Sequence, residues 1–240
     1  MGILLLAVSI LPVILLMLYI YKQDKYEKEP LGLLLLAFFG GILAIPMDLI
    51  LVYFVNSVYY SETVFYSAFI EAGFCEELCK FCILMLFIWR NKNFNEYMDG
   101  IVYATFVGLG FACVENIMYV FEGGLGTGIM RGLLSVPGHF LFAVVMGYFL
   151  SMAKFHKEKR GTYLLLSLFG AVLAHGLFDW MLMITDVLPP AFSIAIFVIF
   201  IWADIKLWKV GMKYIRQHRE SSQFKEPEFK QIDWNAGNQE

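Results

Sequence analysis

Residues 72–89 read Ala-Gly-Phe-Cys-Glu-Glu-Leu-Cys-Lys-Phe-Cys-Ile-Leu-Met-Leu-Phe-Ile-Trp, an apolar run that contains two adjacent glutamates and a lysine. An apolar run of about 18 residues is long enough to cross a bilayer as a helix. A charged side chain near the centre of such a helix costs about 2.5–3.5 kcal/mol on insertion scales. A membrane protein tolerates such charges where they face other helices or a wet cavity, so Glu76, Glu77 and Lys80 are candidates for a functional site.

Apolar runs of this length recur along the whole chain. The 240 residues are 60% hydrophobic and 16% charged, which is typical of a polytopic membrane protein in a lipid bilayer and not of a soluble domain. The net charge of −3 gives no indication of nucleic-acid binding. We expect an all-α membrane helix bundle of about seven transmembrane spans, at residues 3–21, 31–56, 63–90, 99–121, 131–153, 161–183 and 190–210.

The loops between these spans predict an orientation. Lysine and arginine gather in the first, third and fifth loops and after the last span, whereas the fourth loop has only Arg131 at its edge. This bias predicts that the N-terminus lies outside the cell and the C-terminus in the cytoplasm. The first run has no basic start or cleavage site, so it is predicted to be a retained span. Residues 1–210 then form one transmembrane domain, and residues 211–240 form a polar tail that begins as a frayed helix and continues as disordered chain.

Three further spans carry ionisable residues at a similar depth. They are Glu115 on the fourth span, His139 on the fifth, and His175 with Asp179 on the sixth. At 1.5 Å per residue, these positions lie nearer the outer ends of their spans than the inner ends. Asp179 is one helical turn from His175, so it can orient the imidazole, or both can bind a metal.

The paired glutamates have one basic neighbour. Lys80 lies four residues from Glu76 and three from Glu77, so it can pair with either but hardly with both fully. General acid–base catalysis uses two carboxylates in different environments, and such a pairing would create them. A structural ion pair that fixes helix packing is the alternative. On the next span, the small residues Gly108 and Gly110 permit close helix approach.

Zinc is a candidate cofactor. Histidine and carboxylate ligands suit the ion and leave a position for water, and the candidate ligands are Glu76, Glu115, His139 and His175. No HExxH helix is present, so direct glutamate chemistry remains open. The cysteines of the spans are interpreted as small packing residues and not as a disulfide framework or a metal site. Asp48, Glu71 and Asp99 are weaker candidates for the functional site, and Asp99 can simply cap its helix.

The order of the motifs resembles a known family. Glu76-Glu-Leu-Cys-Lys80, Phe111-Ala-Cys-Val-Glu115, the solitary His139 and His175-Gly-Leu-Phe-Asp179 follow one another on four successive spans. This order is similar to that of the PrsW family of bacterial intramembrane proteases, a distant branch of the CAAX-protease and bacteriocin-processing superfamily. The similarity covers about residues 70–183.

The resemblance implies the first, extracytoplasmic cleavage of a single-span anti-sigma factor, which frees an extracytoplasmic-function sigma factor. It also implies the catalytic residues, which are Glu76, Glu77, Glu115, His139, His175 and Asp179, with Lys80 in support. The wider superfamily usually has a longer EExxxR motif and a histidine where Glu115 stands, so zinc and glutamate mechanisms both stay open. A proton-coupled transporter can use the same residues as a relay, but no internal repeat is present. A non-catalytic membrane scaffold is the other alternative, although the paired glutamates are intact.

Overall fold

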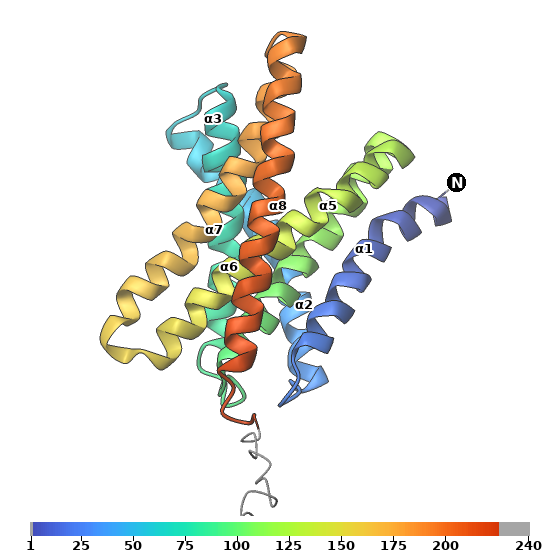
Figure 1. Ribbon diagram of the computed structural model, residues 1–240. Coiled ribbons are helices and arrows are strands. Elements are labelled where there is room, and N and C mark those ends of the chain that lie inside the picture. Colours follow the sequence, from blue (N-terminus) through green and yellow to red (C-terminus); the bar gives the residue numbers. More distant parts are fainter. Residues whose placement is uncertain (1, 226–240) are drawn as a thin grey trace, which may run out of the picture.

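The computed structural model describes residues 2–225, and within this range the chain forms helices joined by short links (Figure 1). In chain order the elements are α1 (Gly2–Gln23), α2 (Leu31–Val58), α3 (Val64–Tyr66), the π-helix η1 (Ser67–Glu76), α4 (Glu77–Ile83), the π-helix η2 (Leu84–Ile88), α5 (Tyr97–Leu133), α6 (Ser135–Phe155), the 3-10 turn η3 (Lys157–Lys159), α7 (Arg160–Met183), the 3-10 turn η4 (Ile184–Asp186) and α8 (Pro190–Glu220). The predicted all-α fold class is confirmed.

All seven predicted spans fall on helical segments. In the described part of the chain, five runs are long and apolar enough to cross a membrane, at Gly2–Gln23, Leu31–Val58, Tyr97–Phe155, Lys157–Asp186 and Pro190–Glu220. The longest of these runs contains both α5 and α6, which pack against each other and correspond to two predicted spans. The remaining predicted span is the helical stretch from α3 to η2, which also carries the charged residues of the candidate site.

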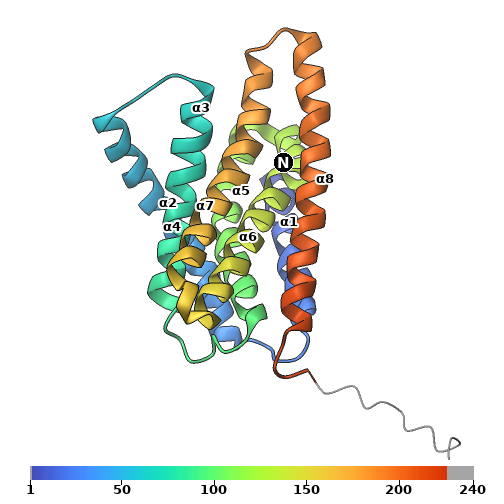
Figure 2. The same ribbon diagram turned by 60° about the vertical axis from the view of Figure 1, so that its left-hand side comes forward.

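The helices α5 and α6 form the core of the bundle. Every residue of α5 from Met98 to Cys113 is buried, and so is every residue of α6 from Gly138 to Gly147. By contrast, α8 runs along one edge of the bundle and buries few side chains (Figure 2). Large apolar side chains on the outer helices are exposed. This pattern is expected where the outer faces of the helices contact lipid instead of water.

Glycines on α5 allow its neighbours to approach closely. A Cβ atom at Gly110 would lie 2.1 Å from the carbonyl oxygen of Phe38 on α2. A Cβ atom at Gly108 would lie 2.8 Å from the Cβ of Ala143 on α6. Both distances are shorter than van der Waals contact, so a larger residue would push the helices apart. The predicted close approach at these two glycines is therefore confirmed.

The helix that carries the paired glutamates changes type along its length. It begins at α3, where Oγ1 of Thr63 accepts a hydrogen bond from the backbone N–H of Tyr66 at 3.3 Å. It continues as the π-helix η1 up to Glu76 and becomes an α-helix at Glu77. Long π-helical segments are rare, and π-turns occur frequently at functional sites. The change of helix type therefore falls between the two glutamates of the candidate site.

Near its end, α5 reverses direction at a single residue. Gly124 has a φ of 80° and a ψ of −165°, and it is the one residue inside α5 with non-helical angles. Glycine adopts this backbone region without the steric cost that other residues have there. After the reversal, the last turns of α5 run back along the preceding part, so that Arg131 contacts Glu115 and Asn116.

The last helix extends beyond its predicted end. α8 continues to Glu220, and Nε2 of His218 lies 3.0 Å from the carbonyl oxygen of Tyr148 on α6. The first residues of the predicted polar tail are therefore a packed continuation of the helix. The expected disorder of the tail concerns mainly residues 226–240, which lie outside the described residues. The division at residue 210 stays a prediction.

Candidate active site

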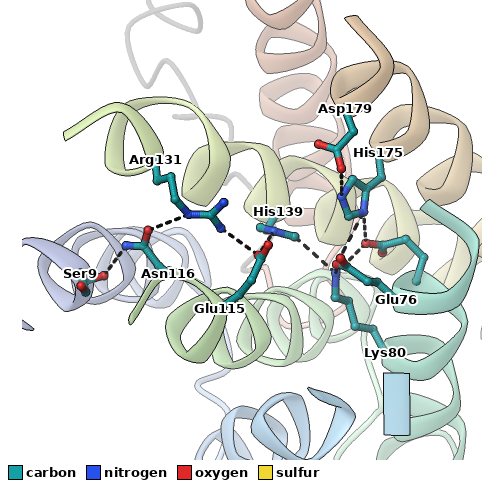
Figure 3. A network of polar contacts seen from close by, with 10 residues as sticks. Ser9, Glu76, Lys80, Glu115, Asn116, Arg131, His139, His175 and Asp179 are labelled. Carbon is teal, nitrogen blue, oxygen red and sulfur yellow. Dashed lines mark hydrogen bonds and ion pairs between the residues drawn. The ribbon is translucent and has the colours of Figure 1, made fainter. Parts of the chain in front are cut away.

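The structure brings the predicted site residues together in one polar network (Figure 3). They come from four helical stretches, and they are Glu76 at the end of η1, Glu77 and Lys80 on α4, Glu115 on α5, His139 on α6, and His175 and Asp179 on α7. Hydrogen bonds and ion pairs connect all of them. The predicted convergence is therefore observed, while the catalytic role of each residue stays a prediction.

The ammonium of Lys80 lies at the centre of this network. Its Nζ is 3.0 Å from Oε2 of Glu76, 2.8 Å from Oε1 of Glu77 and 3.3 Å from Nδ1 of His139. The same nitrogen lies 4.0 Å from the centroid of the Phe111 ring. The expectation that Lys80 would hardly pair with both glutamates is wrong, because the spacings of four and three residues place both carboxylates within 3.0 Å of its ammonium.

His139 connects this centre to Glu115. Its Nε2 lies 2.7 Å from Oε2 of Glu115, and its Nδ1 faces the Lys80 ammonium. Because an ammonium can only donate, Nδ1 accepts the hydrogen bond and Nε2 carries the proton that Glu115 accepts. The carboxylate of Glu115 therefore fixes both the tautomer and the orientation of the ring.

His175 has a similar arrangement beside the other glutamate. Its Nδ1 lies 2.9 Å from Oε1 of Glu77, and its Nε2 lies 3.3 Å from Oδ2 of Asp179. The ring stacks on Phe142 with a centroid distance of 4.6 Å and meets the ring of His139 edge-on at 5.1 Å. Asp179 thus holds the outer nitrogen of His175, as their spacing of one helical turn predicts.

The central donors have the composition of a metal site. One ligand atom from each of Glu76, Glu77, His139 and His175 lies within 4.8 Å of the others. Imidazole and carboxylate ligands suit zinc, and metal-binding histidines usually donate their other ring N–H to a carboxylate or carbonyl. Glu115 was a predicted ligand candidate, but it lies on the outer nitrogen of His139, and Glu77 takes its place in the group.

These donors already surround a cation, the ammonium of Lys80. Two cations a few ångströms apart repel each other strongly in a buried site, where water does not screen them. A metal ion held by the same donors would therefore take the place of this ammonium. The donor set fits a metal ion on the condition that the Lys80 side chain moves.

A cavity of about 330 Å³ lies beside the network. Its polar wall is formed by Glu115, Tyr119, Arg131, Ser135, His139, His175 and Asp179. The paired glutamates do not line this cavity and lie behind the two histidines. The side chain of Glu76 is 12% exposed, whereas that of Glu77 is 1% exposed. A molecule in the cavity would therefore meet the histidines first, and Glu76 is the more accessible of the two glutamates.

Arg131 is the member of the network that sequence reasoning missed, because it was interpreted only as a loop charge. Its Nη2 lies 3.0 Å from Oε2 of Glu115, and its Nε donates to Oδ1 of Asn116 at 3.1 Å. Asn116 in turn donates to the backbone carbonyl of Ser9 on α1 at 2.7 Å. The signal available in the sequence was Gly123-Gly124, which lies midway between Glu115 and Arg131, since a reversal of the chain there brings these two charges together.

The three weaker candidate carboxylates take no part in these hydrogen bonds and ion pairs. Oδ2 of Asp99 accepts from the backbone N–H of Glu96 at 2.7 Å, and the predicted helix cap is therefore confirmed. Glu71 accepts from Nδ2 of Asn56 at 2.7 Å. In the described part of the chain, Oδ1 of Asp48 has no hydrogen-bond partner. The four cysteines are free thiols, as expected, and lie outside the group of metal-binding geometry.

Comparison with known proteins supports the resemblance seen in the motifs. Residues 29–203 match the family described as PrsW family intramembrane metalloprotease. The chain is 34% identical over 224 residues to Protease PrsW of Clostridioides difficile (strain 630), which covers 89% of this chain and 91% of the relative. It is 36% identical over 218 residues to Protease PrsW of Geobacillus kaustophilus (strain HTA426), with 88% and 94% covered. For Protease PrsW of Bacillus subtilis (strain 168), the identity is 35% over 195 residues, with 81% and 88% covered.

No solved structure matches this chain. The family match spans every residue of the network that the motifs predicted, and the similarity to the curated relatives extends over most of both chains. The chain therefore belongs to the PrsW family of intramembrane metalloproteases and is a membrane-embedded peptidase.

Proposed function

We propose that this chain makes the first, extracytoplasmic cut in a membrane-spanning anti-sigma factor and thereby starts the release of an extracytoplasmic-function sigma factor. The observation that carries the proposal is the buried network of carboxylates and histidines beside a cavity of about 330 Å³. This volume is within the usual range of ligand pockets, about 300–1,000 Å³. Hydrolysis inside a membrane needs such a place, because the hydrocarbon region itself holds neither water nor polar partners.

The position of the cavity in the bundle supports cleavage on the outer side. Arg131 in its wall belongs to the segment after the α5 reversal, in which Gly128 lies beside Val8 near the start of α1 (Figure 1). The basic loops and the end of α8 meet at the opposite end, through contacts of Lys154 with the Trp89 carbonyl and of Arg219 with Gln23. The positive-inside rule then assigns the cavity end to the outside of the cell.

We assign the activation of water to Glu76. It is the partly exposed member of the glutamate pair, and Oε2 of Glu115 already accepts from His139 and contacts Arg131, which engages that carboxylate in positioning. A carboxylate in this role takes a proton from water as the oxygen attacks the peptide carbonyl, and then gives it to the leaving nitrogen. The ammonium of Lys80 holds this carboxylate in position and provides its counter-charge.

The histidines form the wall between the glutamates and the cavity. Glu77, His139 and His175 are the residues that would hold a zinc ion, which when bound supplies a Lewis acid and an activated water. Without an ion, the ring N–H groups already face Glu115, Glu77 or Asp179, so an oxyanion would need a donor other than the two histidines. Glu115 and Asp179 keep the two rings in position through their outer nitrogens.

The test uses purified protein in lipid vesicles with candidate single-span anti-sigma factors, and mass spectrometry locates the cut. We expect the unmodified chain to cut on the extracytoplasmic side. Glu76→Ala, Glu77→Ala and His175→Ala should insert and accumulate without cutting. Glu62→Ala is the matched control, because Glu62 is an exposed glutamate in the link before α3 and takes no part in the network. Normal cleavage by all three network variants would contradict the proposal.

The same assay separates the two chemistries. Loss of cleavage with a chelator, and its return with added zinc, would support a metal mechanism. Unchanged cleavage in chelator would support direct activation of water by a glutamate.

A further inference from the structure

One buried nitrogen in the cavity wall has no hydrogen-bond acceptor from the protein. Nη2 of Arg131 is 3.0 Å from Oε2 of Glu115, but it makes no hydrogen bond in the described part of the chain. The contact is therefore an ion pair whose N–H groups are not aimed at the carboxylate. A buried donor without a partner costs about 1–3 kcal/mol and is uncommon in native structures. This atom itself is closed off from solvent, but the Arg131 side chain lines the cavity, so a ligand there would meet the guanidinium through its exposed part.

The rest of the side chain is held in place on the protein side. Nε of Arg131 donates to Oδ1 of Asn116 at 3.1 Å, and the guanidinium lies 4.2 Å from the centroid of the Tyr119 ring. The backbone carbonyl of Ser9 anchors Asn116 from α1. The side chain is only 16% exposed. The guanidinium is thus fixed in one orientation before any ligand arrives, which is what electrostatic catalysis requires of a donor.

The acceptor is also indicated by the neighbours. Nη2 of Arg131 and Nε2 of His139 contact the same oxygen of Glu115, so the guanidinium lies directly beside the imidazole that faces the cavity. His139, His175 and Arg131 all line this cavity. A peptide carbonyl placed against the two histidines would therefore present its oxygen to the arginine.

We propose that Arg131 is a catalytic residue, whose guanidinium donates hydrogen bonds to the carbonyl oxygen of the scissile peptide bond. The inference rests on the proposed peptide hydrolysis. The water oxygen bonds to the carbonyl carbon, and the π electron pair of the C=O bond moves onto its oxygen, which the guanidinium faces. When this intermediate collapses, the C–N bond breaks, and the proton taken from water by Glu76 passes to the leaving nitrogen. Arg131 gains and loses no proton in the cycle.

The alternative is that Arg131 only positions Glu115 through its charge. A lysine at this position would keep the positive charge, but its ammonium cannot reproduce the planar fork of N–H donors of the guanidinium. The two roles therefore predict different results for Arg131→Lys. Loss of an oxyanion donor lowers kcat by about 10²–10³-fold, whereas loss of a positioning charge is repaired by another cation.

The experiment follows a single-span peptide with a fluorophore and a quencher on opposite sides of the cut, in vesicles that contain the unmodified chain or a variant. We expect Arg131→Ala and Arg131→Lys each to lower kcat by about 10²–10³-fold, with KM and bound-metal content close to those of the unmodified chain. Millimolar guanidinium should restore part of the activity of Arg131→Ala and none of that of Glu76→Ala. Arg160→Ala is the control, because it removes an arginine that lies outside the network, where its Nε donates to the Ala153 carbonyl.

Three results would overturn the inference alone, while the unmodified chain still cuts the peptide. The first two concern turnover. They are a kcat of Arg131→Ala within about twofold of the unmodified value, and full activity of Arg131→Lys. Loss of bound metal in both variants would also overturn it, since that result assigns the residue to positioning. If the unmodified chain cuts no single-span substrate, the proposed function fails and this inference fails with it.

Discussion

Replacing Lys80 with methionine removes the cation that Glu76 and Glu77 share. Methionine keeps most of the volume of the side chain, so the change acts mainly on charge. The ammonium is 2.8 and 3.0 Å from the two carboxylates, and its side chain is only 3% exposed. Without it, two buried carboxylates face each other with little water to separate them. The native state must then hold uncompensated charge, or a proton, at this position.

The magnitude follows from the burial of the pair. Removal of one partner from a buried ion pair costs about 3–5 kcal/mol, because the other charge stays buried without compensation. For a chain of about this length, each kcal/mol shifts the unfolding midpoint by about 2–4 °C. We therefore expect the Tm of Lys80→Met to fall by about 6–20 °C in detergent micelles. Tryptophan fluorescence can follow the transition, since the chain has five tryptophans.

Lys206→Met is the matched control. Lys206 is exposed on α8, and its Nζ lies 5.3 Å from the centroid of the Trp202 ring. An exposed contact of this kind contributes about 0.5–1 kcal/mol, so the control should lose no more than about 4 °C. Addition of Glu77→Gln to Lys80→Met should recover part of the loss, because it removes one of the two facing charges. A midpoint for Lys80→Met within the range of the control would refute the assignment of Lys80 as the counter-charge.

Two further predictions concern packing and pH. Gly110→Ala should destabilise the bundle by about 1–3 kcal/mol, because its Cβ would meet the carbonyl oxygen of Phe38 at 2.1 Å. Gly161→Ala is the control in the same unfolding assay, because a Cβ atom there would have no neighbouring atom within 4 Å. Equal unfolding midpoints for the two variants would contradict the close packing of Gly110 against α2. Between α1 and α2, burial raises the pKa of Asp24 to about 7 and that of Glu29 to about 7, whereas the unfolded chain releases these protons near pH 4. At these two groups the folded state therefore binds more protons between these values, so their contribution to stability should be largest below about pH 4, fall as the pH rises to about 7, and level off above it. Unfolding midpoints across this range should show the slope, and the double variant Asp24→Asn with Glu29→Gln should flatten it; a slope that this variant leaves unchanged would exclude these two carboxyl groups as its source.

Helix positions were predictable from the sequence because each span is a long apolar run between charged or glycine-containing links. The main difference lies in the glycine-rich link after the fourth span, which was expected to be a loop. In the structure this link is helical except at Gly124. The returning segment packs against α1, where Gly128 lies beside Val8. Such a contact joins residues far apart in sequence, so neither periodicity nor composition indicates it.

The sequence predicted which residues form the site better than it predicted which of them contact each other. An ionisable residue in an apolar span is a strong signal by itself, and it identified Glu115 and His139 on separate helices. Which partner each side chain takes depends on helix type and on the angle between helices. Lys80 reaches His139 as well as both glutamates, and the α5 reversal adds Arg131. The contacts with His139 and Arg131 join different segments of the chain and were not evident from the spacing of the motifs.

The central claim is that the buried network performs peptide hydrolysis. The most direct measurement is the single-turnover rate at which vesicles containing the chain cut a single-span membrane peptide, compared with the rate for Glu76→Gln. Glutamine keeps the size of the side chain but cannot take a proton from water, so we expect the rate to fall by at least about 10²-fold while the variant remains folded and inserted. Equal rates for the two proteins would contradict the assignment of Glu76 as the base, and no cleavage by either would contradict the peptidase function.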